Sequence, residues 1–268
     1  MMLLEVRNLT IRFGSTTVVD NVSFDVNAGE RLGIIGESGS GKTLTSLAVI
    51  GLLPETADVS GSVKFNGKEL TNLSDRELSS IRGKHIGMVF QEPLTALNPL
   101  MRVGKQIAQP LRNHQGISLK EGMKRAIALC ERVGLPDPDR IVRSYPHQLS
   151  GGQRQRIGLA TALACSPALL IADEPTTALD VTVQKEVLKL MNDLVSQEGS
   201  ALIFVSHDLP VVSSMTERVA VMQHGKIIEL ASVGTLFANA TDDYSKMLIR
   251  TAQLSDDSFT RLTTGSAQ

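Results

Sequence analysis

The sequence predicts an α/β fold in which a mostly parallel β-sheet carries an inserted block of helices. Beyond residue 150, apolar strand-like runs alternate with helical segments, a pattern typical of a parallel sheet with covered faces. Between residues 91 and 148 the strand-like runs vanish and helical segments follow one another, which indicates an insertion into the core. The chain has 268 residues, of which 42% are hydrophobic and 21% charged, so it can bury a sizeable core.

The first 90 residues are expected to form strands around one helix. An apolar strand ends at Ile35 and leads into a glycine-rich loop, which opens the helix. In chain order the expected elements are short strands over 3–35, a helix over 42–53 and a strand over 85–90. Turns and loops are expected at 13–14, 28–29, 54 and 60–61.

The remaining elements follow from the same patterns. The expected segments are helices over 103–114, 119–133 and 151–165, strands over 169–172 and 201–205, and a strand pair around residues 224 and 225. Another helix has apolar residues at the spacing of one buried face, namely Val183, Val187, Leu190 and Leu194. After about Arg250 the chain is rich in Ser, Thr and Asp, which indicates a loose tail.

Composition limits the classes of function. The net charge is -1, so no global basic field favours nucleic acid as a partner. The start of the sequence shows no charged-then-apolar signal peptide. No apolar stretch approaches the roughly 18 residues needed to span a bilayer, and the longest candidate is interrupted by Ser166 and Pro167. We therefore expect any role at a membrane to depend on a partner.

A glycine-rich loop over residues 36–43 fits the P-loop pattern for phosphate binding. Its residues are Gly36, Glu37, Ser38, Gly39, Ser40, Gly41, Lys42 and Thr43. Glycines allow the tight turn that points backbone N–H groups at phosphate oxygens, and the following helix adds the positive end of its dipole. Lys42 is expected to reach the β- and γ-phosphates, and the Thr43 hydroxyl to bind Mg²⁺. The alternative is a glycine-rich turn without a ligand.

Two adjacent acids end a buried strand at residues 169–173. Such carboxylates are costly to bury without a cation or a water network. Side chains that are neighbours on a strand point to opposite faces, so the two acids should have different roles. Asp173 suits a Mg²⁺ ligand, and Glu174 suits the orientation or deprotonation of an attacking water. The alternative is a solvated strand end.

The segment LSGGQ over residues 149–153 opens a predicted helix. Ser150 and Gln153 have the spacing of a capping box, which is the structural alternative for this motif. Gly151 and Gly152 in the first turn each cost about 1 kcal/mol relative to alanine, and a cap does not require them. Glycines here would let a phosphate approach the N–H groups of the helix.

Together, the P-loop, the acidic strand end and LSGGQ resemble the nucleotide-binding domain of ABC transporters over about residues 3–250. The resemblance implies a P-loop NTPase (RecA-like) core with a mostly parallel sheet, an N-terminal antiparallel β subdomain and an inserted α-helical subdomain. It places the core and β subdomain at 1–91 and 159–250, the helical subdomain at about 92–158 and a polar tail at 251–268. ATP and Mg²⁺ are the implied ligands.

The resemblance also assigns single residues. It implies that Ser150, Gly151, Gly152 and Gln153 close over ATP held by a partner subunit. Gln91 resembles a glutamine that contacts Mg²⁺ and couples to the membrane. Ala178, Leu179 and Asp180 resemble a loop that crosses between subunits. His207 resembles a histidine that contacts the γ-phosphate, with a helix-start residue as the alternative. Phe13 occupies the place of an aromatic residue that stacks on adenine, with a core strand residue as the alternative.

The strand pattern supports these assignments independently. Gly36, Gln91, the pair Asp173 and Glu174, and His207 each follow an apolar strand. Ligands of open parallel sheets bind at the carboxyl ends of strands. The sequence therefore predicts that these residues serve one nucleotide.

Longer stretches resemble the peptide/nickel importer branch, among them QEPLTALNP at residues 91–99 and EPTTALDVTVQ at residues 174–184. The resemblance implies two transmembrane permeases, a second ATPase and, indirectly, an extracytoplasmic solute-binding protein. A related but different second ATPase is favoured, with a homodimer as the alternative. The chain would act at the cytoplasmic face of the inner membrane, and residues 91–148 would dock a permease; the alternative is an ordinary helical core.

Three other functions agree less well with the sequence. A non-transport ABC ATPase acting on nucleic acid or ribosomes is the main alternative, but the chain has no long coiled coil, second cassette or basic arm. A GTPase should contain Asn-Lys-x-Asp, which is absent. A regulatory module without turnover is disfavoured because Glu174 and His207 are both present.

Overall fold

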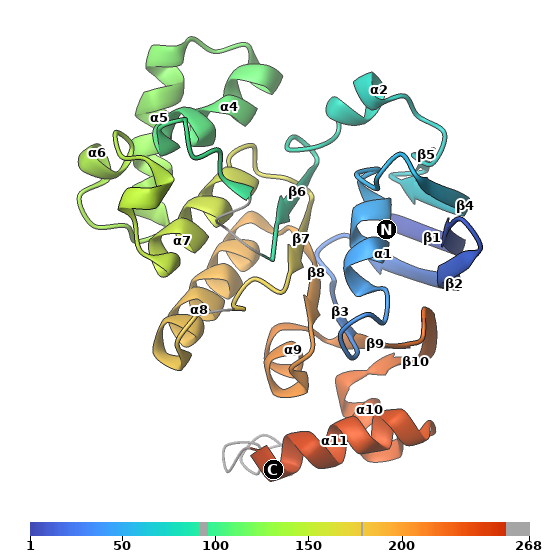
Figure 1. Ribbon diagram of the computed structural model, residues 1–268. Coiled ribbons are helices and arrows are strands. Elements are labelled where there is room, and N and C mark those ends of the chain that lie inside the picture. The colour runs from blue at the N-terminus through green and yellow to red at the C-terminus, as the bar shows by residue number, and fades with distance from the viewer. Residues whose placement is uncertain (92–95, 178, 256–268) are drawn as a thin grey trace. The chain divides into compact units, whose positions relative to one another are not determined.

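The computed structural model describes residues 1–91, 96–177 and 179–255. It contains two compact units, one of Met1–Asn72 with Ile203–Gln268 and one of Leu73–Leu202 (Figure 1). Within the described ranges no helix is both long and apolar enough to cross a membrane. The boundaries expected for the helical subdomain at about 92–158 stay a prediction.

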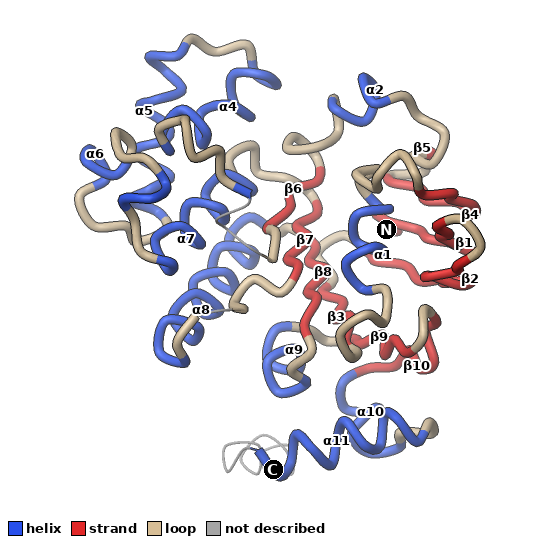
Figure 2. The backbone as a smooth tube through the Cα atoms, in the orientation of Figure 1, coloured by secondary structure: helices blue, strands red, loops and turns tan. Residues whose placement is uncertain are grey.

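The first unit combines two sets of strands with helices (Figure 2). Its strands are β1 (Met2–Phe13), β2 (Thr16–Asn27), β3 (Arg31–Ile35), β4 (Ala57–Phe65), β5 (Lys68–Glu69), β9 (Arg218–Gln223), β10 (Lys226–Ser232) and β8 (Ala201–Ser206) from Ile203 onward. Its helices are α1 (Lys42–Val49), α9 (Leu209–Met215), α10 (Val233–Asn239) and α11 (Asp243–Ser255).

An antiparallel sheet in the order β2-β1-β4-β5 forms the N-terminal part of the first unit. Four apolar residues along β1 are fully buried: Leu4, Val6, Leu9 and Ile11. The change of spacing between Val6 and Leu9 coincides with a register shift against β2, where Asn8 has a φ of +52°. Side chains alternate along a strand, so this β-bulge returns the apolar residues to the buried face.

The prediction of a loop at Ser60 and Gly61 is wrong, because both residues lie inside β4. Gly61 has a φ of +103° and lies against the bulge of β1, where an added Cβ would be only 2.5 Å from the carbonyl oxygen of Asn8. Glycine is therefore required here by the close approach of two strands, and not by a turn. The strands β4 and β5 and the short helix α2 (Asp75–Ser79) were not predicted.

Strands β10, β9, β3 and β8 are neighbours in that order in the second sheet of the first unit. β3 runs parallel to β9, and β9 pairs antiparallel with β10 across a two-residue turn at His224 and Gly225, as predicted. Both turn residues have positive φ, +47° and +78°, which matches the tight hairpins whose twist suits β-strands. Residues 32–35 of β3 are buried, so the strand that carries the P-loop is fixed in the core.

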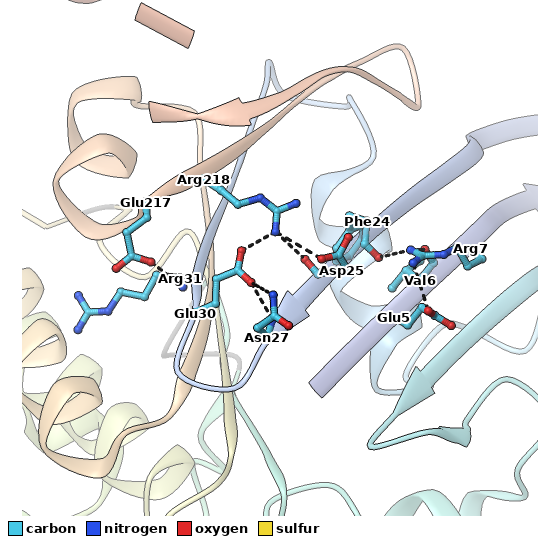
Figure 3. A network of polar contacts seen from close by, with 10 residues as sticks. All are labelled: Glu5, Val6, Arg7, Phe24, Asp25, Asn27, Glu30, Arg31, Glu217 and Arg218. Carbon is cyan, nitrogen blue, oxygen red and sulfur yellow. Dashed lines mark hydrogen bonds and ion pairs between the residues drawn. The ribbon is translucent and has the colours of Figure 1, made fainter. Parts of the chain in front are cut away.

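A polar network joins the turn between β2 and β3 to β9 (Figure 3). Arg218 of β9 donates a hydrogen bond to Glu30 and lies 3.5 Å from the carboxylate of Asp25. The other oxygen of Glu30 accepts from the backbone N–H of Asn27 at 2.8 Å and from its side chain at 2.9 Å. Glu217 accepts from the backbone N–H of Arg31 at 3.2 Å. These contacts hold the start of β3.

The second unit contains the helical part and two parallel strands. Its elements are α2, β6 (Ile86–Val89), α4 (Val103–Gln115), α5 (Leu119–Arg132), α6 (Pro138–Ile141), a 3₁₀ turn (Pro146–Gln148), α7 (Gly151–Ala162), β7 (Leu169–Asp173) and α8 (Val181–Glu198). β6 and β7 pair in parallel, and α4, α5 and α7 pack on one another. The predicted helices over 103–114 and 119–133 are confirmed to within one residue.

Three predicted helices and the predicted tail need correction, and the first is α7, which ends at Ala162 and not at residue 165. α1 ends at Val49, and not at residue 53, because Gly51 takes a left-handed φ of +60°. On α8, Val187 and Leu194 are buried as predicted, but Val183 and Leu190 are half-buried, and Met191 is buried instead. The loose tail expected after Arg250 is wrong up to Ser255, because α11 continues to that residue. The rest of the expected tail, 256–268, lies outside the described residues.

Candidate functional site

The P-loop joins β3 to α1 in the first unit, and its glycines occupy positions that other residues could not. A Cβ on Gly36 would lie 2.1 Å from the carbonyl oxygen of Met222, closer than any side chain allows. Gly39 and Gly41 have φ values of +80° and +100°, a region that L residues rarely adopt. A Cβ on Gly39 would meet nothing within 4 Å, so this glycine is required by backbone conformation alone.

Lys42 is a buried cation that the P-loop itself holds. The side chain is 4% exposed, and Nζ donates to the carbonyl oxygens of Gly36 at 2.8 Å and Glu37 at 2.9 Å. Burial of a charge is unfavourable unless partners compensate. Phosphate oxygens would be stronger partners for the ammonium than neutral carbonyl groups, because both members of the pair would be charged.

The start of α1 fits an anion. Its N-cap residue is Gly41, and no side chain caps the helix. Ser40 is 2% exposed, and its Oγ has no hydrogen-bond partner among the described residues. Thr43, in the first turn, is half-buried. A phosphate group would supply acceptors both for the hydroxyl of Ser40 and for the N–H groups at the positive end of the helix.

Two other candidates of the first unit lie at strand ends. Asp208 caps α9 by accepting a hydrogen bond from the N–H of Val211 at 3.2 Å, so the helix-start role belongs to Asp208 and not to His207. His207 is exposed between β8 and α9. Phe13 ends β1 and is half-buried, so it is not a fully buried core residue. The roles predicted for His207 and Phe13 stay predictions.

In the second unit, Gln91 and Glu174 are in contact. β6 and β7 are in parallel register with Val89 opposite Ala172, so the residues two positions further along are level with each other. Gln91 Nε2 donates to Glu174 Oε2 at 3.3 Å. Thr177 Oγ1 donates to the same oxygen at 2.9 Å. The two strand ends therefore bring together a carboxylate and two donors that orient it.

Glu174 and Asp173 have different environments, as expected for different roles. Asp173 is 2% exposed at the end of β7, whereas Glu174 is half-buried. Glu174 has a φ of +43°, in the left-handed region that glutamate rarely adopts. Such backbone strain costs about 1–3 kcal/mol and is concentrated at functional sites. The left-handed conformation of Glu174 turns the chain sharply after β7.

The LSGGQ segment forms the predicted capping box at the start of α7. Ser150 Oγ accepts from the N–H of Gln153 at 3.3 Å, and Gln153 Oε1 accepts from the N–H of Ser150 at 3.0 Å. A Cβ on Gly152 would lie 2.8 Å from Val183 of α8, so this glycine has a packing reason that the sequence interpretation missed. A Cβ on Gly151 would make only an ordinary 3.6 Å contact. The predicted approach of a phosphate depends mainly on Gly151.

Asp180 has a structural role in addition to the one predicted from the resemblance. It is the N-cap of α8, and its carboxylate accepts a hydrogen bond from the N–H of Val183 at 3.0 Å. The residue is exposed. Ala178, which belongs to the same predicted loop, lies outside the described residues.

Sequence reasoning missed two residues that contact the candidates. Thr177 orients Glu174, and its only signal was a hydroxyl three residues after the acid. Tyr244 accepts a hydrogen bond from the N–H of Glu37 at 2.8 Å. These two residues are 207 positions apart, so no local pattern could reveal the contact.

A family model described as "ABC transporter" matches residues 19–177. The oligopeptide transport ATP-binding protein OppD of Bacillus subtilis is 47% identical over 249 residues, which cover 91% of this chain and 70% of the relative. The dipeptide transport ATP-binding protein DppD of Lactococcus lactis subsp. cremoris is 44% identical over 265 residues, which cover 97% of this chain and 76% of the relative.

A solved structure extends the similarity to a nucleotide complex. It is the dimeric post-hydrolysis state of the ATP-binding cassette MJ0796 bound to ADP and Pi, with a TM-score of 0.75 and 30% sequence identity. The match covers 86% of this chain and 99% of that chain.

Proposed function

Because the chain belongs to the ABC transporter family, as an ATPase subunit of the oligopeptide and dipeptide importer branch, we propose that it hydrolyses ATP to drive peptide uptake through partner permeases. The observation that carries the proposal is the carboxylate of Glu174, whose Oε2 receives hydrogen bonds from Gln91 and Thr177. A carboxylate oriented in this way suits a general base.

In this proposal the first unit binds the nucleotide. The N–H groups of the P-loop and of the first turn of α1 bind phosphate oxygens, together with Ser38 and Ser40. Lys42 exchanges the carbonyl oxygens of Gly36 and Glu37 for the β- and γ-phosphates. Phe13 stacks on adenine and His207 contacts the γ-phosphate.

The second unit supplies the hydrolytic groups. Glu174 takes a proton from the attacking water, and Gln91 and Thr177 fix the plane of its carboxylate. Thr43, Gln91 and Asp173 would hold Mg²⁺, which neutralises charge that develops on the phosphate oxygens. Among the described residues no three His, Cys, Asp or Glu side chains are grouped to hold a metal, and Mg²⁺ is commonly held by one or two carboxylates together with substrate phosphates.

In this proposal a second ATPase subunit completes each ATP site. Ser150, Gly151, Gly152 and Gln153 bind the γ-phosphate of ATP held by that partner, and Asp180 lies in the loop that faces it. Support comes from Gly151, where an added Cβ would make only an ordinary contact, and from the dimeric state in which the similar cassette was solved. A related but different partner ATPase is favoured over a second copy.

A groove in the second unit is the proposed docking site for a permease at the cytoplasmic face of the membrane. Its volume is about 440 Å³. Six of its lining residues are Arg82, Leu97, Asn98, Met101, Gln106 and His114. The neighbouring Leu100 is 88% exposed, an apolar side chain available to a partner. Cysteines at Thr95 or Asn98 would allow crosslinking to the permease. Asn98 is exposed, whereas Thr95 lies outside the described residues.

Reconstitution tests the proposal. The chain is purified with its companion ATPase and permeases, and placed in proteoliposomes with the solute-binding protein. Labelled dipeptides, oligopeptides and nickel are then offered with ATP. Peptide uptake that needs ATP, and that is abolished in the same complex carrying Glu174→Gln, is the expected result. ATP-dependent uptake of nickel alone would contradict the peptide assignment, and absence of ATP hydrolysis would contradict the proposal as a whole.

A further inference from the structure

The C-terminal helix contacts the P-loop backbone inside the first unit. The N–H of Glu37 donates to the hydroxyl oxygen of Tyr244 at 2.8 Å. Tyr244 is the second residue of α11 and is only 8% exposed. Most N–H groups of a P-loop are available to phosphates, but this one is already occupied by a side chain from another part of the chain.

The same peptide group also holds Lys42. The peptide that joins Gly36 to Glu37 has its carbonyl at Gly36, which accepts from Lys42 Nζ at 2.8 Å, and its N–H at Glu37, which donates to Tyr244. A peptide group is planar, so its N–H and its carbonyl turn together. A constraint on the N–H therefore fixes the direction of the carbonyl that holds the ammonium.

Tyr244 is itself firmly placed. The backbone N–H of Tyr244 donates to the carboxylate of Asp242 at 2.8 Å. Earlier in the same segment, the backbone N–H of Thr241 donates to the carboxylate of Glu229 in β10 at 3.0 Å. α11 also packs on α9, the helix that follows His207. Burial raises the pKa of Tyr244, so its hydroxyl stays neutral at physiological pH.

We propose that Tyr244 is a positioning residue of the ATP site, which fixes the peptide group between Gly36 and Glu37 and thereby the resting position of Lys42. The inference rests on the proposed function of Lys42 in binding ATP phosphates. A P-loop already held in one shape loses less conformational freedom when ATP binds. Without the Tyr244 hydroxyl, the peptide group can rotate and ATP binds more weakly.

The test uses Tyr244→Phe in the full chain, because phenylalanine keeps the buried ring and removes only the hydroxyl. Affinity for a fluorescent ATP analogue with Mg²⁺ is measured by titration. The dissociation constant should rise about three- to tenfold, as for the loss of one hydrogen bond, while the melting temperature without nucleotide falls by only about 2–4 °C. The matched control is Tyr145→Phe, since the chain has two tyrosines and Tyr145 lies in the second unit.

A double-mutant cycle separates positioning of Lys42 from general support of the fold. If Tyr244 acts through Lys42, Tyr244→Phe should change the dissociation constant by less than twofold in a Lys42→Ala background. The same fold-change in both backgrounds would overturn the proposal. So would unchanged affinity of Tyr244→Phe, provided that the wild-type chain binds the nucleotide. Failure of the wild-type chain to bind would instead overturn the proposed function.

A spectroscopic measurement keeps the proposal testable if Tyr244→Phe does not fold. Incorporation of 3-fluorotyrosine into the Tyr145→Phe chain leaves one ¹⁹F signal, from residue 244. Addition of ATP and Mg²⁺ should shift this signal, because Lys42 then leaves the carbonyl of Gly36. A signal that does not move while the nucleotide is bound would contradict the proposal.

Discussion

Gln91 Nε2 donates a hydrogen bond to Glu174 Oε2 across 3.3 Å, and this contact links the ends of the parallel strands β6 and β7. The proposed general base is therefore oriented by a residue that follows a different strand. Gln91 also precedes the segment that lines the proposed permease groove, from Ala96 to Met101. We expect that a partner which displaces this segment also moves Gln91, and with it the hydrogen bond to Glu174.

Glu174→Gln should bind ATP with nearly wild-type affinity but hydrolyse it about 10²–10⁴ times more slowly, because an amide cannot take a proton from water. The variant should also accumulate an ATP-bound dimer with its partner. Steady-state ATPase assays and size-exclusion chromatography with ATP measure the two effects. Turnover near the wild-type rate would show that Glu174 is not the base.

Lys42→Ala should weaken nucleotide binding at least about tenfold, because it removes a charge-assisted contact with the phosphates. Equilibrium titration with an ATP analogue gives the dissociation constant. Lys226→Ala is the matched control, since Lys226 is 62% exposed and pairs with Asp20 on the surface. Equal affinities of the two variants would contradict the role of Lys42.

The ATPase rate per subunit of the isolated chain should fall on dilution, because each site is proposed to need Ser150 to Gly152 from a partner. Addition of the companion ATPase and permeases should restore the rate. Activity is measured against protein concentration, with light scattering to follow the oligomeric state. A high rate that does not depend on dilution, from a chain shown to be monomeric, is incompatible with shared sites.

Glu30→Gln should lower the free energy of unfolding near neutral pH by about 1–2 kcal/mol, because it weakens hydrogen bonds from Asn27 and Arg218. Burial alone would raise the pKa of Glu30, but the hydrogen bonds from Asn27 and Arg218 outweigh it and lower the pKa. Because the pKa of Glu30 is lower in the folded state than in the unfolded state, its carboxylate stabilises the fold fully above the unfolded-state pKa. This stabilisation is lost as the pH falls through the folded-state pKa.

The difference in free energy of unfolding between wild type and Glu30→Gln should therefore be largest near neutral pH. It should shrink as the pH falls below the range in which glutamate ordinarily titrates. Urea denaturation at several pH values measures this difference. Asp20→Asn is the control, because its ion pair with Lys226 is exposed and worth little. A difference that grows toward acid pH would contradict the role given to the Glu30 carboxylate.

Local patterns predicted the elements whose causes are local. The helices α4 and α5 follow from their apolar spacing, and the P-loop from its glycines and Lys42. Gly61 was mistaken for a loop residue because its need for glycine comes from Asn8 on another strand. The packing of Gly152 on Val183 and the contact of Tyr244 with Glu37 were missed for the same reason. Each depends on a neighbour that is remote in sequence.

The left-handed backbone at Glu174 has a consequence for evolution and engineering. Glycine adopts this conformation without strain, and asparagine tolerates it better than glutamate does, so either would relieve the turn after β7. With Glu174 as the proposed general base, selection for thermal stability alone would favour a chain that lacks its base. The proposed catalytic role of this carboxylate would then keep the free energy of unfolding below the value that the fold could reach.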